Sequence, residues 1–223
     1  MVGSKISLAG ILAACFLMPN AYADQGEGMG GFGGLTVGLT AFPKYIDQAN
    51  AAAVAGTVNT MAQTTEHPIG YDFNAYGGYW ATENLGVEVG AKFMSGPSGT
   101  TDLYDNATGL LMSEGNYSTS AASFYAALDL RAGSDSEVVL KLGMHRTSVG
   151  LTTDGIPLTN GAQSVSVSST GVLVGMRVDI GPHAIFGIDY LGGVSTPNLA
   201  WPNLTTNDPK KYSLVDFTLG YRF

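Results

Sequence analysis

Apolar and polar residues alternate along most of the chain, in segments separated by runs of turn-forming residues. In the last segment, one set of alternate positions holds Val215, Phe217, Leu219, Tyr221 and Phe223, and the positions between them hold Asp, Thr, Gly and Arg. Successive side chains of a β-strand point to opposite faces, so this spacing predicts strands with one apolar face. Eight segments are predicted to be strands: residues 32–42, 69–81, 86–94, 118–132, 138–153, 164–181, 184–194 and 211–223.

The connectors between these strands alternate in length. ATENLG, AGSDSE and IGPHA are short and rich in turn-forming residues, whereas those at about 43–68, 95–117, 154–163 and 195–210 are long and polar. Both ends of the strand region then lie on the side of the short turns. Short periplasmic turns and longer extracellular loops are typical of bacterial outer-membrane barrels. The sequence therefore predicts an all-β protein, an eight-stranded antiparallel transmembrane β-barrel.

A soluble sandwich or lipocalin-like barrel would also alternate, with its apolar face turned toward a core. Two features favour the membrane. The charged positions stand beside glycine and alanine, as in a cramped interior, and the aromatic residues gather near the strand ends, as in two interfacial girdles. The girdle on the turn side would hold Phe32, Tyr79, Trp80, Tyr221 and Phe223, and the girdle on the loop side would hold Phe42, Tyr71, Phe73, Phe93 and Phe124.

The composition agrees with apolar residues distributed over strands. Only 13% of the residues are charged while 45% are hydrophobic, against roughly 25% charged in soluble domains. From Gln25 onward no apolar stretch approaches the roughly 18 residues of a membrane-spanning helix. The formal net charge of -8 argues against a nucleic-acid partner.

The first 23 residues have the pattern of a signal peptide. Lys5 supplies a positive start, an apolar run follows, and Ala21-Tyr22-Ala23 matches an A-x-A cleavage site. Residues 24–31 are then a glycine-rich leader, and the barrel occupies 32–223. A lipoprotein box ending at Cys15 is the competing interpretation. Because Cys15 is the only cysteine, cleavage after Ala23 leaves a chain without a disulfide.

Four segments in order carry a resemblance to a known family. AYGGYWATENLGVEVGAKFMSG, FYAALDLRAGSDSEVVLKLGMHR, TGVLVGMRVDIGPHAIFGIDYLG and LVDFTLGYRF resemble successive hairpins of the OmpA-like outer-membrane β-barrel domain across nearly the whole mature chain. The expected protein is a barrel domain alone, without the peptidoglycan-binding domain of outer membrane protein A. The resemblance implies a monomer in the bacterial outer membrane, in contact with lipid and lipopolysaccharide.

The resemblance also implies a role for the terminal strand. In such families the barrel-assembly machinery reads a last strand that has alternate apolar residues and a terminal aromatic residue. The corresponding residues here are Val215, Phe217, Leu219, Tyr221 and Phe223.

The positions opposite the apolar face hold charges of both signs. An eight-stranded barrel is just wide enough for its side chains to fill, and an unpaired charge in such a space is costly. The predicted lumen network consists of Asp72, Glu88, Lys92, Asp129, Arg131, Lys141, Arg177, Asp179, Asp189, Asp216 and Arg222. Two interpretations stay open, a packed network that plugs the lumen and a gated path for small ions.

Other sequence features do not indicate a chemical site. Gly26-x-Gly28-x-x-Gly31 matches a dinucleotide fingerprint but lacks the preceding strand and the following helix. His67, His145 and His183 do not have metal-ligand spacing. A lipid-modifying enzyme would pair His145 with Ser148 or Thr147, yet no motif marks a nucleophile. We therefore predict no catalytic residue, no cofactor and no metal.

The long connectors are the expected interaction surface. Residues 47–62 have alanine, valine and methionine at helical spacing, so a short surface helix competes there with an irregular loop. Apolar residues on the loops could bind a host or other surface ligand: Tyr104, Leu110, Leu111, Tyr117, Leu199 and Trp201. The expected function is non-enzymatic, in membrane integrity or in adhesion and immune evasion. A narrow porin-like channel or small-solute transporter is the alternative.

Overall fold

The computed structural model describes residues 30–42, 60–67, 69–105, 107–132, 137–154, 164–180, 183–197 and 211–223. The ordered elements in these ranges are strands: β1 (Gly30–Ala41), β2 (Thr60–His67), β3 (Ile69–Trp80), β4 (Leu85–Asp105), β5 (Leu111–Arg131), β6 (Val138–Asp154), β7 (Ser164–Ile180), β8 (Ala184–Ser195) and β9 (Lys211–Arg222). Within the described part of the chain, no helix is long and apolar enough to cross a membrane.

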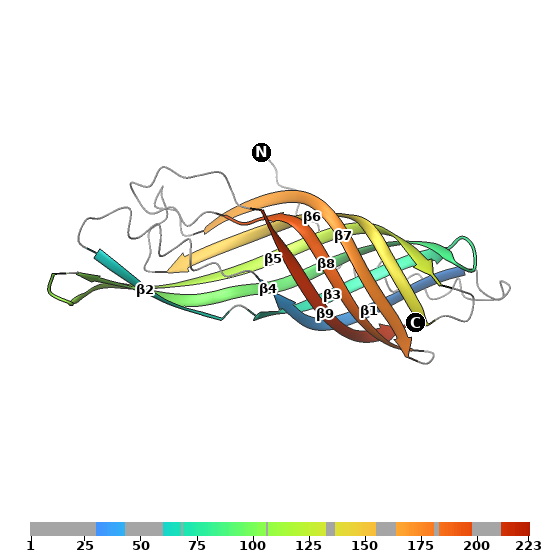
Figure 1. Ribbon diagram of the computed structural model, residues 1–223, viewed down its shortest axis with the longest axis horizontal. Helices are drawn as coiled ribbons and strands as arrows, with labels where there is room; N and C mark the ends of the chain where they lie inside the picture. Colours follow the sequence, from blue (N-terminus) through green and yellow to red (C-terminus); the bar gives the residue numbers. More distant parts are fainter. Residues whose placement is uncertain are drawn as a thin grey trace.

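The strands form one antiparallel sheet in the order β2-β4-β3-β1-β9-β8-β7-β6-β5, and β4 pairs with β5 to close it. Eight strands make the closed barrel, and β2 pairs only with the part of β4 that extends past β3. Figure 1 shows the strands running obliquely along the long axis, with β2, β4 and β5 at the end that projects beyond the other strands. The predicted fold class, an eight-stranded antiparallel barrel, is confirmed.

Two predicted loops differ in part from the structure. Strand β4 continues to Asp105 and β5 starts at Leu111, so most of 95–117 is a paired hairpin. Strand β2 lies within the predicted loop 43–68. These segments were missed because the prediction required one apolar face, and the hairpin, which is mostly polar, does not alternate regularly. Its strands are held by backbone hydrogen bonds to their neighbours.

Several predictions fall outside the described residues. They are the signal peptide 1–23, residues 24–29 of the leader, the helix proposed for 47–62 except for its last residues, and most of the connectors 154–163 and 195–210. Gly30 and Gly31 of the predicted leader belong to β1.

The outer wall of the barrel carries a continuous band of exposed apolar side chains, which we call the apolar belt. Tyr71, Leu142 and Leu219 have 74%, 57% and 61% of their surface exposed. Exposed apolar surface on this scale marks contact with a partner or a membrane. The belt consists of Val37, Leu39, Ile69, Tyr71, Tyr79, Leu85, Val87, Val89, Phe124, Leu128, Leu130, Leu140, Leu142, Met144, Val172, Val174, Met176, Ile180, Tyr190, Phe217, Leu219, Tyr221 and Phe223.

On the side of the long connectors, the apolar belt ends at the same height on neighbouring strands. Phe124 of β5 lies opposite Arg146 of β6, which lies opposite Thr170 of β7. One step farther, the outward positions of β6 and β7 hold Ser148 and Ser168, which also lie opposite each other. The barrel wall therefore passes from an apolar zone to a polar zone, as a strand does where it leaves the hydrocarbon of a bilayer.

Replacing Leu142 by arginine tests whether the belt faces lipid. A charge at mid-belt should lower the free energy of unfolding by about 2–4 kcal/mol, measured by denaturant titration in lipid vesicles. Thr152→Arg lies on the same strand and the same face beyond the belt, and it should cost only about 0–1 kcal/mol. Equal losses for the two variants would contradict a lipid-facing belt.

Candidate functional site

The lumen is the part of the structure in which polar chemistry is concentrated. Arg131 and Arg222 of the predicted network are half-buried at the end that carries the short turns. The remaining members are buried: Asp72, Glu88, Lys92, Asp129, Lys141, Arg177, Asp179, Asp189 and Asp216. They come from strands β3 to β9, so the barrel brings together residues that are far apart in the sequence.

One group of charges, which we call the Glu88 cluster, lies toward the turn end. Glu88 is paired with two cations, through Lys141 Nζ at 2.8 Å and Arg177 Nη1 at 2.6 Å. Tyr125 donates its hydroxyl to the same carboxylate over 2.9 Å. A buried carboxylate with two cations and a further donor has its charge well compensated.

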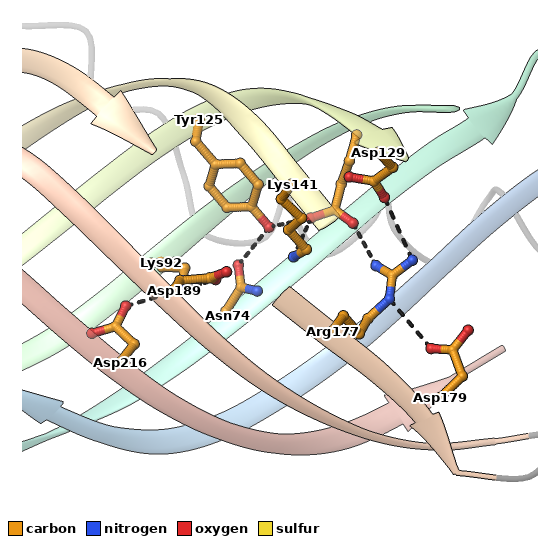
Figure 2. Close-up of polar contacts among 10 residues, drawn as sticks. Asn74, Lys92, Tyr125, Asp129, Lys141, Arg177, Asp179, Asp189 and Asp216 are labelled. Carbon is orange, nitrogen blue, oxygen red and sulfur yellow. Dashed lines mark hydrogen bonds and ion pairs between the residues drawn. The ribbon is translucent and has the colours of Figure 1, made fainter. Parts of the chain in front are cut away.

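Arg177 extends this cluster toward the turn end. Its Nη2 lies 3.4 Å from Asp129 Oδ2, and its Nε lies 3.3 Å from Asp179 Oδ1. Asp179 is also ion-paired with Arg222. Figure 2 shows Arg177 between the two aspartates, with Lys141 and Tyr125 on its other side. The Glu88 cluster thus comprises Glu88, Asp129, Lys141, Arg177, Asp179 and Arg222.

A second group, the Lys92 cluster, lies farther from the turns and consists of Lys92, Asp72, Asp189 and Asp216. Lys92 Nζ is 2.6 Å from Asp189 Oδ2 and 2.9 Å from Asp216 Oδ2. The two aspartates are direct register partners on β8 and β9, so Lys92 lies between two facing carboxylates. Asp72 accepts a hydrogen bond from Thr40 over 3.3 Å. Within the described residues, Asp72 is in no ion pair. The Lys92 cluster therefore has three carboxylates for one ammonium group.

Inward-facing glycines make room for these large side chains. A Cβ on Gly90 would lie 2.4 Å from the Tyr125 ring, and one on Gly175 would lie 2.1 Å from Asp189 Oδ1. Both approaches are closer than atoms tolerate, so the glycines allow Tyr125 to lie over β4 and Asp189 to lie over β7, the strands beside their own. Glycine beside charge is therefore a packing requirement of the network.

An apolar layer covers the Lys92 cluster on the side of the long connectors. On β4, β8 and β9, the next inward residues after Lys92, Asp189 and Asp216 are Met94, Leu191 and Leu214. Strand β1 continues the layer with Phe42 after Thr40. The layer consists of Phe42, Met94, Ala121, Val149, Leu191, Val194 and Leu214, all buried.

Aromatic side chains close the turn end. Trp80 packs on Phe32 with ring centroids 5.4 Å apart, and the Arg131 guanidinium lies 4.2 Å above the Trp80 ring. Arg131 is thus a cation–π partner of Trp80, and among the described residues it makes no ion pair. The lumen therefore holds an aromatic lid, two ionic clusters and an apolar layer in succession.

The predicted network did not include the inward polar residues that make hydrogen bonds in the lumen. Tyr125 and Asn74 are hydrogen-bonded to each other over 3.3 Å. His145 Nδ1 lies 2.8 Å from Thr147 Oγ1, and Nε2 lies 3.0 Å from the carbonyl oxygen of Gly192. Thr147 in turn donates to Ser123 over 2.8 Å. Alternation places all five side chains on the inward face of their strands. Their polar character at inward positions could therefore have identified them from the sequence.

The three histidines lie apart, as their sequence positions suggested. His67 ends β2, His145 lies in the lumen, and His183 lies in the turn before β8, where it stacks on Tyr221 at 4.9 Å. Ser148 lies on the opposite face of β6 from His145, so these two side chains do not meet. Within the described part of the chain, no group of three or more His, Cys, Asp or Glu could hold a metal ion.

The five residues of the predicted assembly signal lie on the outer wall. Val215, Phe217, Leu219, Tyr221 and Phe223 form the outward positions of β9 and the residue after it. The Phe223 amide donates to the Gly33 carbonyl oxygen over 3.0 Å, which ties the end of β9 to β1. Their role in assembly stays a prediction.

Lys92→Met tests how strongly the stability of the barrel depends on the ion pairs in the lumen. The change leaves Asp189 and Asp216 facing each other without a cation, so the free energy of unfolding should fall by about 3–5 kcal/mol. It is measured by urea titration in lipid vesicles. Lys211→Met, exposed at the start of β9, is the control. Adding Asp189→Asn and Asp216→Asn to Lys92→Met should recover most of the lost free energy of unfolding. If Lys92→Met left the urea midpoint unchanged, the barrel would not depend on this ion pair.

Comparison with known proteins agrees with this architecture. A family model for the outer membrane protein beta-barrel domain matches residues 7–223. No curated protein sequence matches the chain. Solved structures similar to it include Ail of Yersinia pestis in complex with the heparin analogue sucrose octasulfate, at 14% identity and a TM-score of 0.46, covering 86% of this chain and 99% of Ail.

Two further solved structures are similar to the chain. OprG of Pseudomonas aeruginosa has 15% identity and a TM-score of 0.43 over 89% of this chain and 98% of OprG. Neisserial surface protein A has 16% identity and a TM-score of 0.38 over 84% of this chain and 95% of that protein. The family match covers nearly the whole chain and agrees with the closed barrel and its apolar belt. The chain therefore belongs to the outer membrane protein β-barrel domain family, whose place is the outer membrane.

Proposed function

We propose that this protein is a non-enzymatic surface-interaction protein. In this proposal the barrel anchors the protein in the membrane, and the extended β2–β4–β5 sheet with its neighbouring connectors contacts the surface ligand. The observation that carries the proposal is the filled lumen. A barrel whose interior is occupied by ion pairs beneath an apolar layer offers little room for solute passage, so function is assigned to its outer surface. We infer that it belongs to the OmpA-like branch of small barrels, on the four hairpin segments described above.

The dimensions of the β4–β5 hairpin support an interaction role. On β4 the last large apolar outward residue of the barrel wall is Phe93, and the strand continues to Asp105. At about 3.4 Å per residue this adds roughly 40 Å of strand beyond the belt. Strand β2 pairs along this extension from Thr60 to His67. Figure 1 shows β2 beside the projecting ends of β4 and β5.

The polarity of the extension also supports exposure to water. Ser98, Asn116 and Ser118 are exposed on the outside of the sheet. Long extracellular strands that are polar on the outside would present backbone and side-chain groups to a host or other surface ligand. The belt below them would hold the sheet at a fixed height, in contact with outer-membrane lipid and lipopolysaccharide.

A narrow channel is the second candidate, and one observation favours it. Polar groups line the lumen from Arg222 near the turn end to Thr40 beneath the apolar layer. Opening would require the Lys92 cluster to separate and the apolar layer above it to move. Both steps cost free energy, because they break buried ion pairs and expose apolar side chains.

Single-channel recording distinguishes the two candidates. We expect the purified, folded barrel to give no discrete openings in a planar bilayer, because the two clusters and the apolar layer fill the lumen. Folding is checked in the same preparation by the shift in gel mobility between unheated and heated samples. Reproducible openings whose conductance changes in Lys92→Ala or Asp216→Ala would instead assign the protein to transport.

Shortening the hairpin tests the surface-interaction role. Residues 99–117 are replaced by Asn-Gly, which joins the register partners Ser98 and Ser118 through a two-residue turn. The barrel should keep its heat-modifiable mobility and lose binding to host cells or matrix. The matched control for loop length is a variant that keeps the full hairpin and changes only the order of its outward serine and threonine residues. Full binding by the shortened barrel would count against the proposal.

A further inference from the structure

Arg146 is an exposed cation on the outer wall of the barrel, in the row where the apolar belt ends. Alternation places it outward on β6, between Met144 of the belt and Ser148 of the polar zone. Its register partners are Phe124 of β5 and Thr170 of β7. Within the described residues it has no hydrogen bond and no ion pair, whereas the lysines and arginines of the two ionic clusters are all paired with carboxylates. Its guanidinium group is therefore available to a molecule outside the barrel.

The level of Arg146 on the wall indicates the chemistry of that molecule. The wall changes from apolar to polar at this row, so the hydrocarbon of the bilayer meets the lipid headgroups there. A charged side chain beside hydrocarbon is unfavourable, and it normally has a partner. A guanidinium forms two parallel hydrogen bonds with a phosphate, and phosphate is the anion that lipid headgroups place at this level. Because the short turns lie at the other end of the barrel, the level belongs to the outer leaflet.

A groove of about 590 Å³ lies in the outer wall on the polar side of Arg146. It crosses β4, β5, β6 and β7, and it begins at Ser148, the next outward residue after Arg146. Its lining combines an aromatic ring with small or hydroxyl-bearing side chains and includes Phe93, Ser120, Ala122, Ser148, Gly150 and Ser166. Serine hydroxyls both donate and accept hydrogen bonds, as the hydroxyls of a sugar do. The groove therefore suits a sugar that lies next to the phosphate.

Packing does not explain the glycine at position 150 in this groove. A Cβ on Gly150 would lie 3.5 Å from Ser120 Oγ, which is an ordinary contact distance, so a side chain would fit. The lumen glycines differ, because a Cβ on Gly90 or Gly175 would clash with its neighbours. Glycine inside a strand weakens it. The open position at Gly150 thus lowers strand stability without a packing need, and it widens the groove.

We propose that Arg146 and the groove beside it bind the headgroup of lipopolysaccharide, with a lipid A phosphate on the Arg146 guanidinium and the attached sugar in the groove. The proposal rests on the contact with lipopolysaccharide proposed above, and it names the site of that contact. The formal net charge of the chain is -8, so overall charge would repel an anionic lipid. Binding is therefore local to this cation and its groove.

Arg146→Gln tests the phosphate contact. The purified, folded barrel is titrated in detergent micelles with diphosphoryl lipid A, and the bound lipid is counted by native mass spectrometry. Loss of the charge-assisted hydrogen bonds should raise the Kd about ten- to hundredfold. Lys211→Gln removes another exposed cation, at the start of β9 and outside the groove, and should leave the Kd unchanged. Equal losses for the two variants, or no binding by the unchanged barrel, would overturn the proposal.

The same titration with phosphatidylglycerol distinguishes the two sources of a lipid phosphate. We expect weaker binding of this lipid, because it offers no sugar to the groove. Equal Kd values for the two lipids would assign the site to anionic lipids in general and overturn the assignment to lipopolysaccharide.

Gly150→Leu tests the groove itself. The new side chain fills the groove without a backbone clash, so lipid A binding should weaken while the free energy of unfolding does not fall. Unaltered binding would refute the part assigned to the groove. Among the described residues, none of 99–117 lines the groove, so the barrel with the shortened hairpin should still bind lipid A. Loss of host-cell binding and loss of lipid A binding are therefore separate results.

Discussion

The structure depends on the compensation of Glu88 inside a space that admits almost no solvent. Its carboxylate is held by Lys141, Arg177 and Tyr125, so one acidic group on β4 connects to β5, β6 and β7. Adjacent strands are already joined by backbone hydrogen bonds, but the contacts of Glu88 with Lys141 and Arg177 join β4 to strands that are not its neighbours. Removing one partner would leave a buried charge exposed to low dielectric, which is far more costly than losing a surface ion pair. The contacts of Glu88 therefore join four of the strands, β4 to β7, through their side chains.

The same constraint explains the unusual distribution of residue types. A soluble barrel would place its apolar side chains inside, whereas here the belt residues face outward and the ionic clusters face inward. The outward side chains gain their stabilisation from lipid, and backbone groups are satisfied by strand pairing around a closed wall. Glycines such as Gly90 are needed inside because large side chains of the neighbouring strand lie directly over them. Each feature follows from an inside that is crowded and an outside that is apolar.

The arrangement of the lumen also bears on function. Ion pairs alone could separate and allow passage, but the Lys92 cluster lies beneath Met94, Leu191 and Leu214. Movement of the charges would thus have to be accompanied by movement of the apolar layer. We propose that a barrel filled in this way serves as the support, and that the extension of β4 and β5 is the part that reaches beyond the membrane. This division of roles is the physical basis of the function we propose.

The sequence by itself determined the strands of the barrel, the face of most residues and the closed eight-stranded architecture, because alternation is a local property that turns interrupt. It was wrong for Phe32, Phe42 and Trp80, which it assigned to the outer girdles and which are buried in the lumen. It also identified the inward charges. Only the tertiary structure decided which charges pair: Lys92 meets Asp189 and Asp216, which are 97 and 124 residues away. It also revealed the hairpin extension, the apolar layer and the groove beside Arg146. These depend on strand register and barrel closure, which couple distant residues and leave no local signal in the order of amino acids.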